Sequence, residues 1–418
     1  MNILGVIEDL QELYLCDENK LKVFSMSDTF KYTPKHTLVL EHSRGTESRI
    51  NHLSLFENNN ENLVVLLTHS GLAFVYFPEN WARIPLKFDN FSEHFEDCSV
   101  WSCSLVDNLL AVGANTHQVN IWNLDTGVIQ GVVVHSHNIP CIDFNKSGYL
   151  ASTSIDTTVL VSKTRCTTLS CKTCTEWGWG VKWILRSGIC EVTQLPKSNI
   201  SNLHNRYKSN LPTNYFNQNL NVTGRFDVHH SHNFYTRLRE RLEGLPSNSE
   251  SDEESESIMN FDTTSQEDSD SELIKYLLIQ TTKNSVHLID PSLAKFNLGE
   301  KMHVLAVYVP CLEINIRSFS RLSLLYFIEE FSLCVIGNQF GPEVLFLRIC
   351  KCKNDKSVLK WDYSFVMELN IVLDGKVIGL YVRNHRDYAR VYALTETMSF
   401  YVFNISKIDV EQLINFRL

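Results

Sequence analysis

The chain has 418 residues, of which 44% are hydrophobic and 11% are aromatic, so it is long enough to bury a large core. Its net charge of −10 comes from residues 247–274, which hold ten acidic residues and no Lys or Arg, whereas the remainder carries 38 basic and 38 acidic side chains. This balance excludes a general basic field that would attract nucleic acid to the folded part.

The N-terminal segment gives no sign of export. Met1–Leu10 carries Glu8 and Asp9 where the apolar stretch of a signal peptide would continue, and no apolar run reaches the ~18–20 residues of a membrane span. We therefore expect a soluble chain that is not secreted. Its twelve cysteines are expected to be reduced thiols.

Residues 1–190 are dominated by short apolar runs that turn residues separate, and helical periodicity is missing. Such runs are typical of β-strands. They include Glu12–Cys16, Leu21–Ser25, Leu63–Thr68, Ala73–Phe77, Leu109–Gly113 and Val119–Leu124. The pattern predicts an all-β fold.

The strand pattern has a period. A set of strands and turns begins at Val100 and begins again at Ile139, 39 residues later. This spacing is close to the ~40–45 residues of a four-stranded WD-type blade. We therefore predict a WD-repeat-like β-propeller, and the length without the inserted segment favours seven blades.

The stretch 191–272 breaks the pattern. It is rich in Asn, Ser and His and ends in the acidic tract, and this low hydrophobicity predicts a disordered insertion. The expected division is therefore 1–190 for the first blades, 191–272 for the insertion and 273–418 for the remaining blades. Five hydroxyl residues of the tract have an acidic residue three positions on, which makes them candidate phosphorylation sites unless the tract is only a solvated spacer. They are Ser249, Ser251, Thr264, Ser265 and Ser269.

Three residues match the positions that stabilise a WD blade. Trp122 closes an expected third strand, His137 precedes the next blade, and Asp156 lies in the turn between its second and third strands. We predict that His137 and Asp156 join a buried hydrogen-bonded network with a structural role.

A closer resemblance lies in three segments, Val100–Trp122, His137–Phe144 and Glu176–Gly180. They are similar to the fungal family named for constitutive ribonucleotide-reductase transcription, whose members are WD-repeat-like regulators. The residues that carry the resemblance are Asn115, His117, Asn138, Ile139, Pro140, Trp177, Gly178, Trp179 and Gly180. The resemblance implies a nuclear negative regulator of ribonucleotide reductase genes, acting in deoxynucleotide supply and the DNA-damage response.

The segment Trp177–Gly180 alternates tryptophan with glycine. In an extended segment both indoles lie on one side and both glycines on the other, where a second backbone can approach closely. Trp177 and Trp179 are either core of the blade that begins there or an exposed anchor for a partner. The apolar residues that follow favour core.

Chemistry-bearing motifs are weak. Cys166, Cys171 and Cys174 resemble half of a zinc knuckle, but a fourth ligand at the usual spacing is missing. His229, His230 and His232 are expected to lie in an exposed loop. There is no nucleophile elbow and no phosphate-binding glycine loop. We therefore expect no metal, no cofactor and no enzymatic activity.

The expected function is protein–protein binding by a rigid ring. One alternative is a substrate-receptor subunit of a cullin-type ubiquitin ligase that docks on an adaptor. Another is direct binding of nucleic acid, which the neutral charge balance disfavours. We expect no membrane partner.

Overall fold

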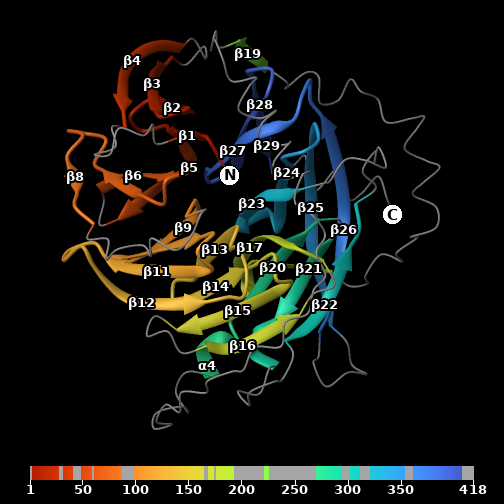
Figure 1. The fold of residues 1–418 in the computed structure, drawn as a ribbon. Coiled ribbons are helices and arrows are strands. Elements are labelled where there is room, and N and C mark those ends of the chain that lie inside the picture. The colour runs from red at the N-terminus through yellow and green to blue at the C-terminus, as the bar shows by residue number, and fades with distance from the viewer. Residues whose placement is uncertain are drawn as a thin grey trace, which may run out of the picture.

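The computed structural model describes residues 2–27, 32–40, 49–58, 61–86, 98–163, 168–173, 176–192, 221–225, 270–283, 285–293, 302–310, 321–353 and 361–406. These residues form seven sheets that follow one another around a common centre as the blades of a propeller (Figure 1). The predicted all-β, seven-bladed propeller is thereby confirmed.

The first four blades are continuous in sequence, and each adds its strands from the inside outward. Blade 1 holds β1 (Leu4–Ile7), β2 (Glu12–Asp17), β3 (Lys20–Met26) and β4 (Tyr32–Val39). Blade 2 holds β5 (Ile50–Asn58), β6 (Glu61–Thr68), β7 (Ala73–Tyr76) and β8 (Arg83–Ile84). Blade 3 holds β9 (Val100–Val106), β10 (Leu109–Ala114), β11 (Gln118–Asn123) and β12 (Val128–Val134). Blade 4 holds β13 (Cys141–Phe144), β14 (Tyr149–Thr153), β15 (Thr158–Lys163) and β16 (Thr168–Thr173).

The last three blades are interrupted or extended. Blade 5 holds β17 (Gly178–Leu185), β20 (Tyr276–Thr282), β21 (Val286–Asp290) and β22 (His303–Tyr308). Blade 6 holds β23 (Leu322–Ile328), β24 (Leu333–Asn338), β25 (Glu343–Lys353) and β26 (Trp361–Val372), and β18 (Cys190–Glu191) runs parallel to β25. Blade 7 holds β27 (Val377–Asn384), β28 (Tyr388–Thr395) and β29 (Ser399–Ser406).

The inserted segment lies within blade 5, because it joins β17 to β20, which pair along their length. Part of it returns to the ring: β19 (Asn221–Arg225) pairs with β29 and is the outermost strand of blade 7. A short helix, α4 (Asp270–Leu273), ends the insertion. Most of the predicted disordered stretch 191–272 lies outside the described residues.

Ring closure is direct. The inner strands contact one another in the order β1, β5, β9, β13, β17, β23 and β27, and β27 then contacts β1. Asn2 reinforces this closure, because its amide Nδ2 donates to Leu380 O at 2.9 Å and its Oδ1 accepts from Leu380 N at 3.1 Å. The first and the last blade therefore lie side by side in the ring.

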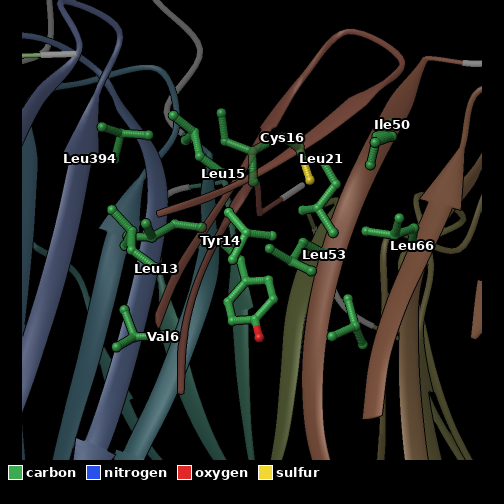
Figure 2. Packing of buried hydrophobic residues seen from close by; sticks show 14 of the residues in the cluster. Val6, Leu13, Tyr14, Leu15, Cys16, Leu21, Ile50, Leu53, Leu66 and Leu394 are labelled. Atoms are coloured by element: carbon green, nitrogen blue, oxygen red, sulfur yellow. The ribbon is translucent and has the colours of Figure 1, made fainter. Parts of the chain in front are cut away.

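The core lies between neighbouring blades. A middle strand packs on both faces, so most of its residues are buried and apolar, as in β6 and β24. An outermost strand has one solvated face, and the burial of β12 alternates accordingly. Figure 2 shows Leu13, Leu53, Leu66 and Leu394, from blades 1, 2 and 7, converging on one such cluster. Burial of apolar surface stabilises the fold by about 25 cal/mol per Å² removed from water. The cores between blades therefore hold neighbouring blades together.

Two kinds of connection share one face of the ring. Because neighbouring strands run antiparallel, the connections that lead into inner strands and the turns between second and third strands lie on the same side. We call this side the top face. No helix among the described residues is long and apolar enough to cross a membrane.

Candidate functional site

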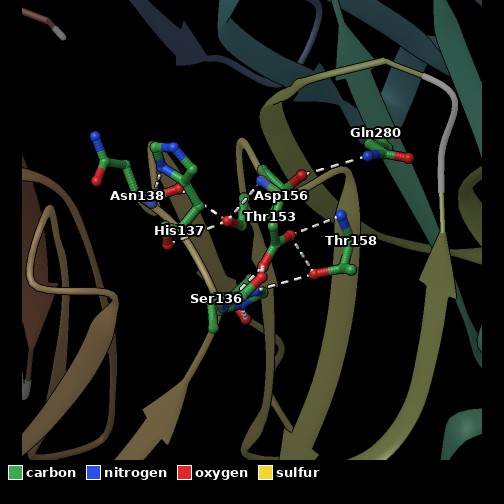
Figure 3. Close-up of polar contacts among 10 residues, drawn as sticks. Ser136, His137, Asn138, Thr153, Asp156, Thr158 and Gln280 are labelled. Carbon is green, nitrogen blue, oxygen red and sulfur yellow. Dashed lines mark hydrogen bonds and ion pairs between the residues drawn. The ribbon is translucent and has the colours of Figure 1, made fainter. Parts of the chain in front are cut away.

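Asp156 organises the top face of blade 4 from the turn between β14 and β15. Its carboxylate accepts hydrogen bonds from the backbone N–H of Ser136 at 3.0 Å and of Thr158 at 2.8 Å (Figure 3). His135 Nδ1 lies 3.3 Å from Asp156 Oδ2, and the other ring nitrogen lies 2.8 Å from Ser152 Oγ. The network joins the connection before blade 4 to two strands of that blade.

The carboxylate of Asp156 is held in its charged form. Burial alone would raise its pKa, but the hydrogen bonds from His135 and Thr158 outweigh burial and hold the pKa of Asp156 well below its usual range. A carboxylate with all these donors is saturated, which supports the structural role predicted for it.

The imidazole in this network is that of His135, whereas the predicted His137 joins it only through its backbone O, which accepts from Ser154 Oγ at 3.2 Å. His135 directly follows β12 and is buried, whereas His137 lies two residues further into the connection and is exposed. The ring of His137 instead accepts from the backbone N–H of Asn138 at 2.8 Å. Trp122 is buried on β11, one blade away from Asp156, in the core shared by blades 2 and 3.

Related cross-links, which sequence reasoning missed, occur in other blades. In blade 5 Thr282 Oγ1 donates to Glu176 at 2.7 Å, and in blade 7 Thr395 Oγ1 donates to Asp374 at 2.8 Å. Each joins the connection before an inner strand to the last residue of the second strand. The signal in the sequence is an acidic residue a few positions before the inner strand and a threonine at the end of the second strand.

The two tryptophans of Trp177–Gly180 have different environments. Trp179 is 6% exposed, as the expectation of core requires, whereas Trp177 is 41% exposed. Their rings meet edge to face with centroids 6.2 Å apart. The glycines have close neighbours: a Cβ at Gly178 would overlap Thr153 Oγ1, and a Cβ at Gly180 would overlap Thr281 Oγ1. Trp177 is therefore a rigidly mounted, exposed aromatic side chain.

The residues that carry the family resemblance come together on the top face of blades 3 to 5. The rings of His117 and His137 lie 5.5 Å apart. Ser154 Oγ donates to Asn138 O at 2.9 Å, and Ser154 O accepts from the backbone N–H of Gly178 at 3.2 Å. Three connections are thus bonded into one surface. We call its exposed and partly exposed residues, namely His117, His137, Asn138 and Trp177, the motif patch.

The patch includes a neutral imidazole. Burial, together with the neighbouring His137, lowers the pKa of His117 below its usual value. At neutral pH His117 therefore offers hydrogen-bonding nitrogens rather than a positive charge. Such a surface is suited to a partner that offers polar groups to the histidines and an apolar contact to Trp177.

Several sequence-based candidates cannot be placed. The five candidate phosphorylation sites, Ser249, Ser251, Thr264, Ser265 and Ser269, lie outside the described residues, as do the three histidines of the predicted loop and Cys166 and Cys174. Among the residues that the structure does describe, no three His, Cys, Asp or Glu side chains gather closely enough to hold a metal ion.

The fold and this surface define a class, the seven-bladed β-propeller scaffold, which is suited to protein–protein interaction. No family model matches the chain. A WD40 repeat-containing protein of Dictyostelium discoideum is 30% identical over 146 residues, which are 33% of this chain and 21% of that protein. An uncharacterized WD repeat-containing protein of Schizosaccharomyces pombe is 29% identical over 146 residues, 30% of this chain and 28% of that protein.

Solved structures agree on the fold. A chain of the crystal structure of the mitotic checkpoint complex superposes with a TM-score of 0.56 at 10% identity, covering 97% of this chain and 87% of that one. The homologues of this chain are therefore WD-repeat proteins, a class that is generally non-catalytic. The match spans less than a third of the length of either relative.

Proposed function

We propose that the chain is a non-catalytic scaffold whose motif patch binds a partner protein. The observation that carries this proposal is the convergence of the resemblance residues from three blades on one exposed surface. Trp177 is half-exposed in that surface, and tryptophan is enriched among residues that dominate binding energy. Its backbone is fixed by the close approach of Gly178 to Thr153, so little conformational entropy is lost on binding.

We further propose that the complex so formed acts in the nucleus and lowers transcription of ribonucleotide reductase genes. This narrower proposal rests on the family resemblance of the motif patch. It assigns the chain to the control of deoxynucleotide supply and of the response to DNA damage. The folded part is neutral in charge, which supports action through a protein partner rather than through direct binding of DNA.

Purification of the tagged full chain from cells tests the scaffold. We expect a defined set of proteins with the wild type and loss of that set with His137→Ala/Trp177→Ala. The matched control is Val307→Ala, which trims an exposed side chain on β22, the outermost strand of blade 5, outside the motif patch. Equal recovery with the patch variant would contradict the assigned surface.

The identity of the recovered proteins separates the alternatives. Recovery of transcription factors would support the role as a regulator. That role also predicts raised ribonucleotide reductase transcripts in cells that lack the chain, and a nuclear signal from a fluorescent fusion. Cullin-ligase subunits would replace it with the substrate-receptor alternative. Nucleic acid that survives high salt would replace it with direct binding.

A further inference from the structure

Arg321 directly precedes β23 on the top face of blade 6 and meets two tryptophans from other blades. Its guanidinium carbon lies 4.3 Å from the ring centroid of Trp179 in blade 5 and 5.7 Å from that of Trp101 in blade 3. All three residues lie at the beginning of inner strands. Because blades 3 and 6 are three positions apart in a ring of seven, these side chains meet near the centre of the ring.

Arg321 is a buried cation without an anion. It is only 3% exposed, and among the described residues its side chain enters no ion pair and donates no hydrogen bond. Its Nε is enclosed without a partner, and so is the indole Nε1 of Trp179. Burial lowers the pKa of Arg321 to about 10, so the guanidinium stays charged at neutral pH.

A buried guanidinium without an anion is unfavourable unless a ligand accepts hydrogen bonds from it. Leaving a buried donor unpaired costs free energy, and more when the donor is charged. The rings of Trp101 and Trp179 offset part of this cost by cation–π attraction. They do not replace the hydrogen bonds that the guanidinium N–H groups lack among the described residues.

We propose that Arg321, Trp101 and Trp179 form an oxyanion-binding site on the top face near the centre of the ring, which receives an acidic or phosphorylated side chain of a partner peptide. A carboxylate and a phosphoryl group can each accept two parallel N–H···O hydrogen bonds from one arginine side chain. The indole Nε1 of Trp179 would supply a further donor. Trp177, whose ring contacts that of Trp179, links this site to the motif patch.

The charge distribution favours a peptide over a nucleic acid. Binding of a phosphodiester backbone draws on many cations along a stripe, whereas this site holds one arginine in an otherwise neutral fold. A single acidic side chain is the matching ligand. The inference deepens the proposed function by naming the chemistry of the partner segment, but its test uses small anions and is independent of any purified partner.

The test titrates the full chain with sodium phosphate or sodium acetate at constant ionic strength, following tryptophan fluorescence and the midpoint of thermal unfolding. We expect both anions to raise the midpoint of the wild type and to change its fluorescence. Arg321→Gln should weaken the apparent affinity at least tenfold. Arg386→Gln, which removes the same charge from an exposed turn of blade 7, should respond as the wild type does. A wild type indifferent to both anions, or an Arg321→Gln variant that responds fully, overturns the proposal.

The test requires a variant at Arg321 that folds. Removal of a buried unpaired charge should leave the anion-free midpoint unchanged or raise it. If Arg321→Gln does not fold, Arg321→Lys serves instead: it keeps the charge, loses the two-pronged donor and should bind phosphate more weakly. Peptides that differ only in a glutamate or a phosphoserine then separate the two sources of the oxyanion. A single-stranded oligonucleotide that displaces both peptides would overturn the choice of a peptide ligand.

Discussion

His135 and Asp156 are 21 residues apart in the chain, yet His135 Nδ1 lies 3.3 Å from Asp156 Oδ2. The contact closes blade 4 at its top face, since His135 belongs to the connection before the blade and Asp156 to the turn between β14 and β15. The same turn supports the motif patch through Ser154. Stability of the blade and geometry of the patch therefore depend on the same few hydrogen bonds.

Asp156→Ala should destabilise the chain by about 1–3 kcal/mol, because it leaves the donors of Ser136 and His135 without an acceptor. The pKa of Asp156 is lower in the folded than in the unfolded chain, so its contribution is present above the usual carboxyl pKa of ~3.9 and is lost as pH falls below it. The difference in unfolding midpoint between wild type and variant should thus be full at pH 7 and smaller near pH 3. Asp125→Ala, which removes an exposed carboxylate, is the control and should change the midpoint little.

His135→Ala and His137→Ala should differ in their effects on stability and on partner capture. The first leaves Ser152 and Asp156 without their shared partner and should lower the unfolding midpoint by a similar ~1–3 kcal/mol. The second trims an exposed ring and should leave stability within about 0.5 kcal/mol while weakening partner capture. A midpoint lowered only by His137→Ala would show that the network is assigned to the wrong histidine.

Gly178→Ala should lower the unfolding midpoint, because its Cβ overlaps the hydroxyl of Thr153; overpacking of this kind typically costs about 1–3 kcal/mol. Adding Thr153→Ala removes the overlapping hydroxyl and should restore part of the loss, beyond what Thr153→Ala alone does. Strict additivity of the two changes would mean that the overlap is not the cause.

Trp179→Ala should cost about 3–5 kcal/mol and give poorly soluble protein, since Trp179 is buried and packs on Arg321. Trp177→Ala should change the unfolding midpoint far less and should abolish capture of the partner. Equal destabilisation by the two variants would show that Trp177 belongs to the core.

Cleavage at a protease site inserted between Gly244 and Leu245 should leave the two fragments bound to each other. β17 and β20 pair from Leu185 and Tyr276 to their far ends, and β1 contacts β27. β18 and β19 also pair with strands of the second fragment, β25 and β29, so the fragments hold each other at several places. Gel filtration after cleavage should give one peak at the size of the intact chain. Separation of the fragments without denaturant would contradict the ring closure.

The sequence predicts blades 3 and 4 well because their turns are marked by polar residues and their strands are short. The strands expected from Val100 onward agree with β9 to β12, and the set expected from Ile139 agrees with β13 to β15. Blade 6 departs from this pattern in structure, because β25 and β26 are long, 11 and 12 residues, and because β25 also pairs with β18 from the other side of the insertion.

The candidate site is only partly visible in the sequence. Residues two apart in an extended segment point to the same side, so pattern alone does not separate His135 from His137. The contact of Arg321 with Trp101 and Trp179 leaves no local signal, because it joins three blades across the ring. The motif patch, by contrast, follows from the residues that carry the resemblance, since they occupy neighbouring connections.

The long interruption of blade 5 has a consequence for synthesis of the chain. β17 ends at Leu185, but the strand that covers it begins at Tyr276, roughly ninety residues later. At ~5–20 residues per second, the ribosome needs on the order of 5–20 s to deliver that partner. During this time blades 1 to 4 can assemble, while the edge of β17, with Trp183 and Ile184, has no strand to pair with. A nascent chain of this length is therefore the stage at which chaperones are needed most, and synthesis that stops within the insertion should yield aggregates rather than a shorter folded ring.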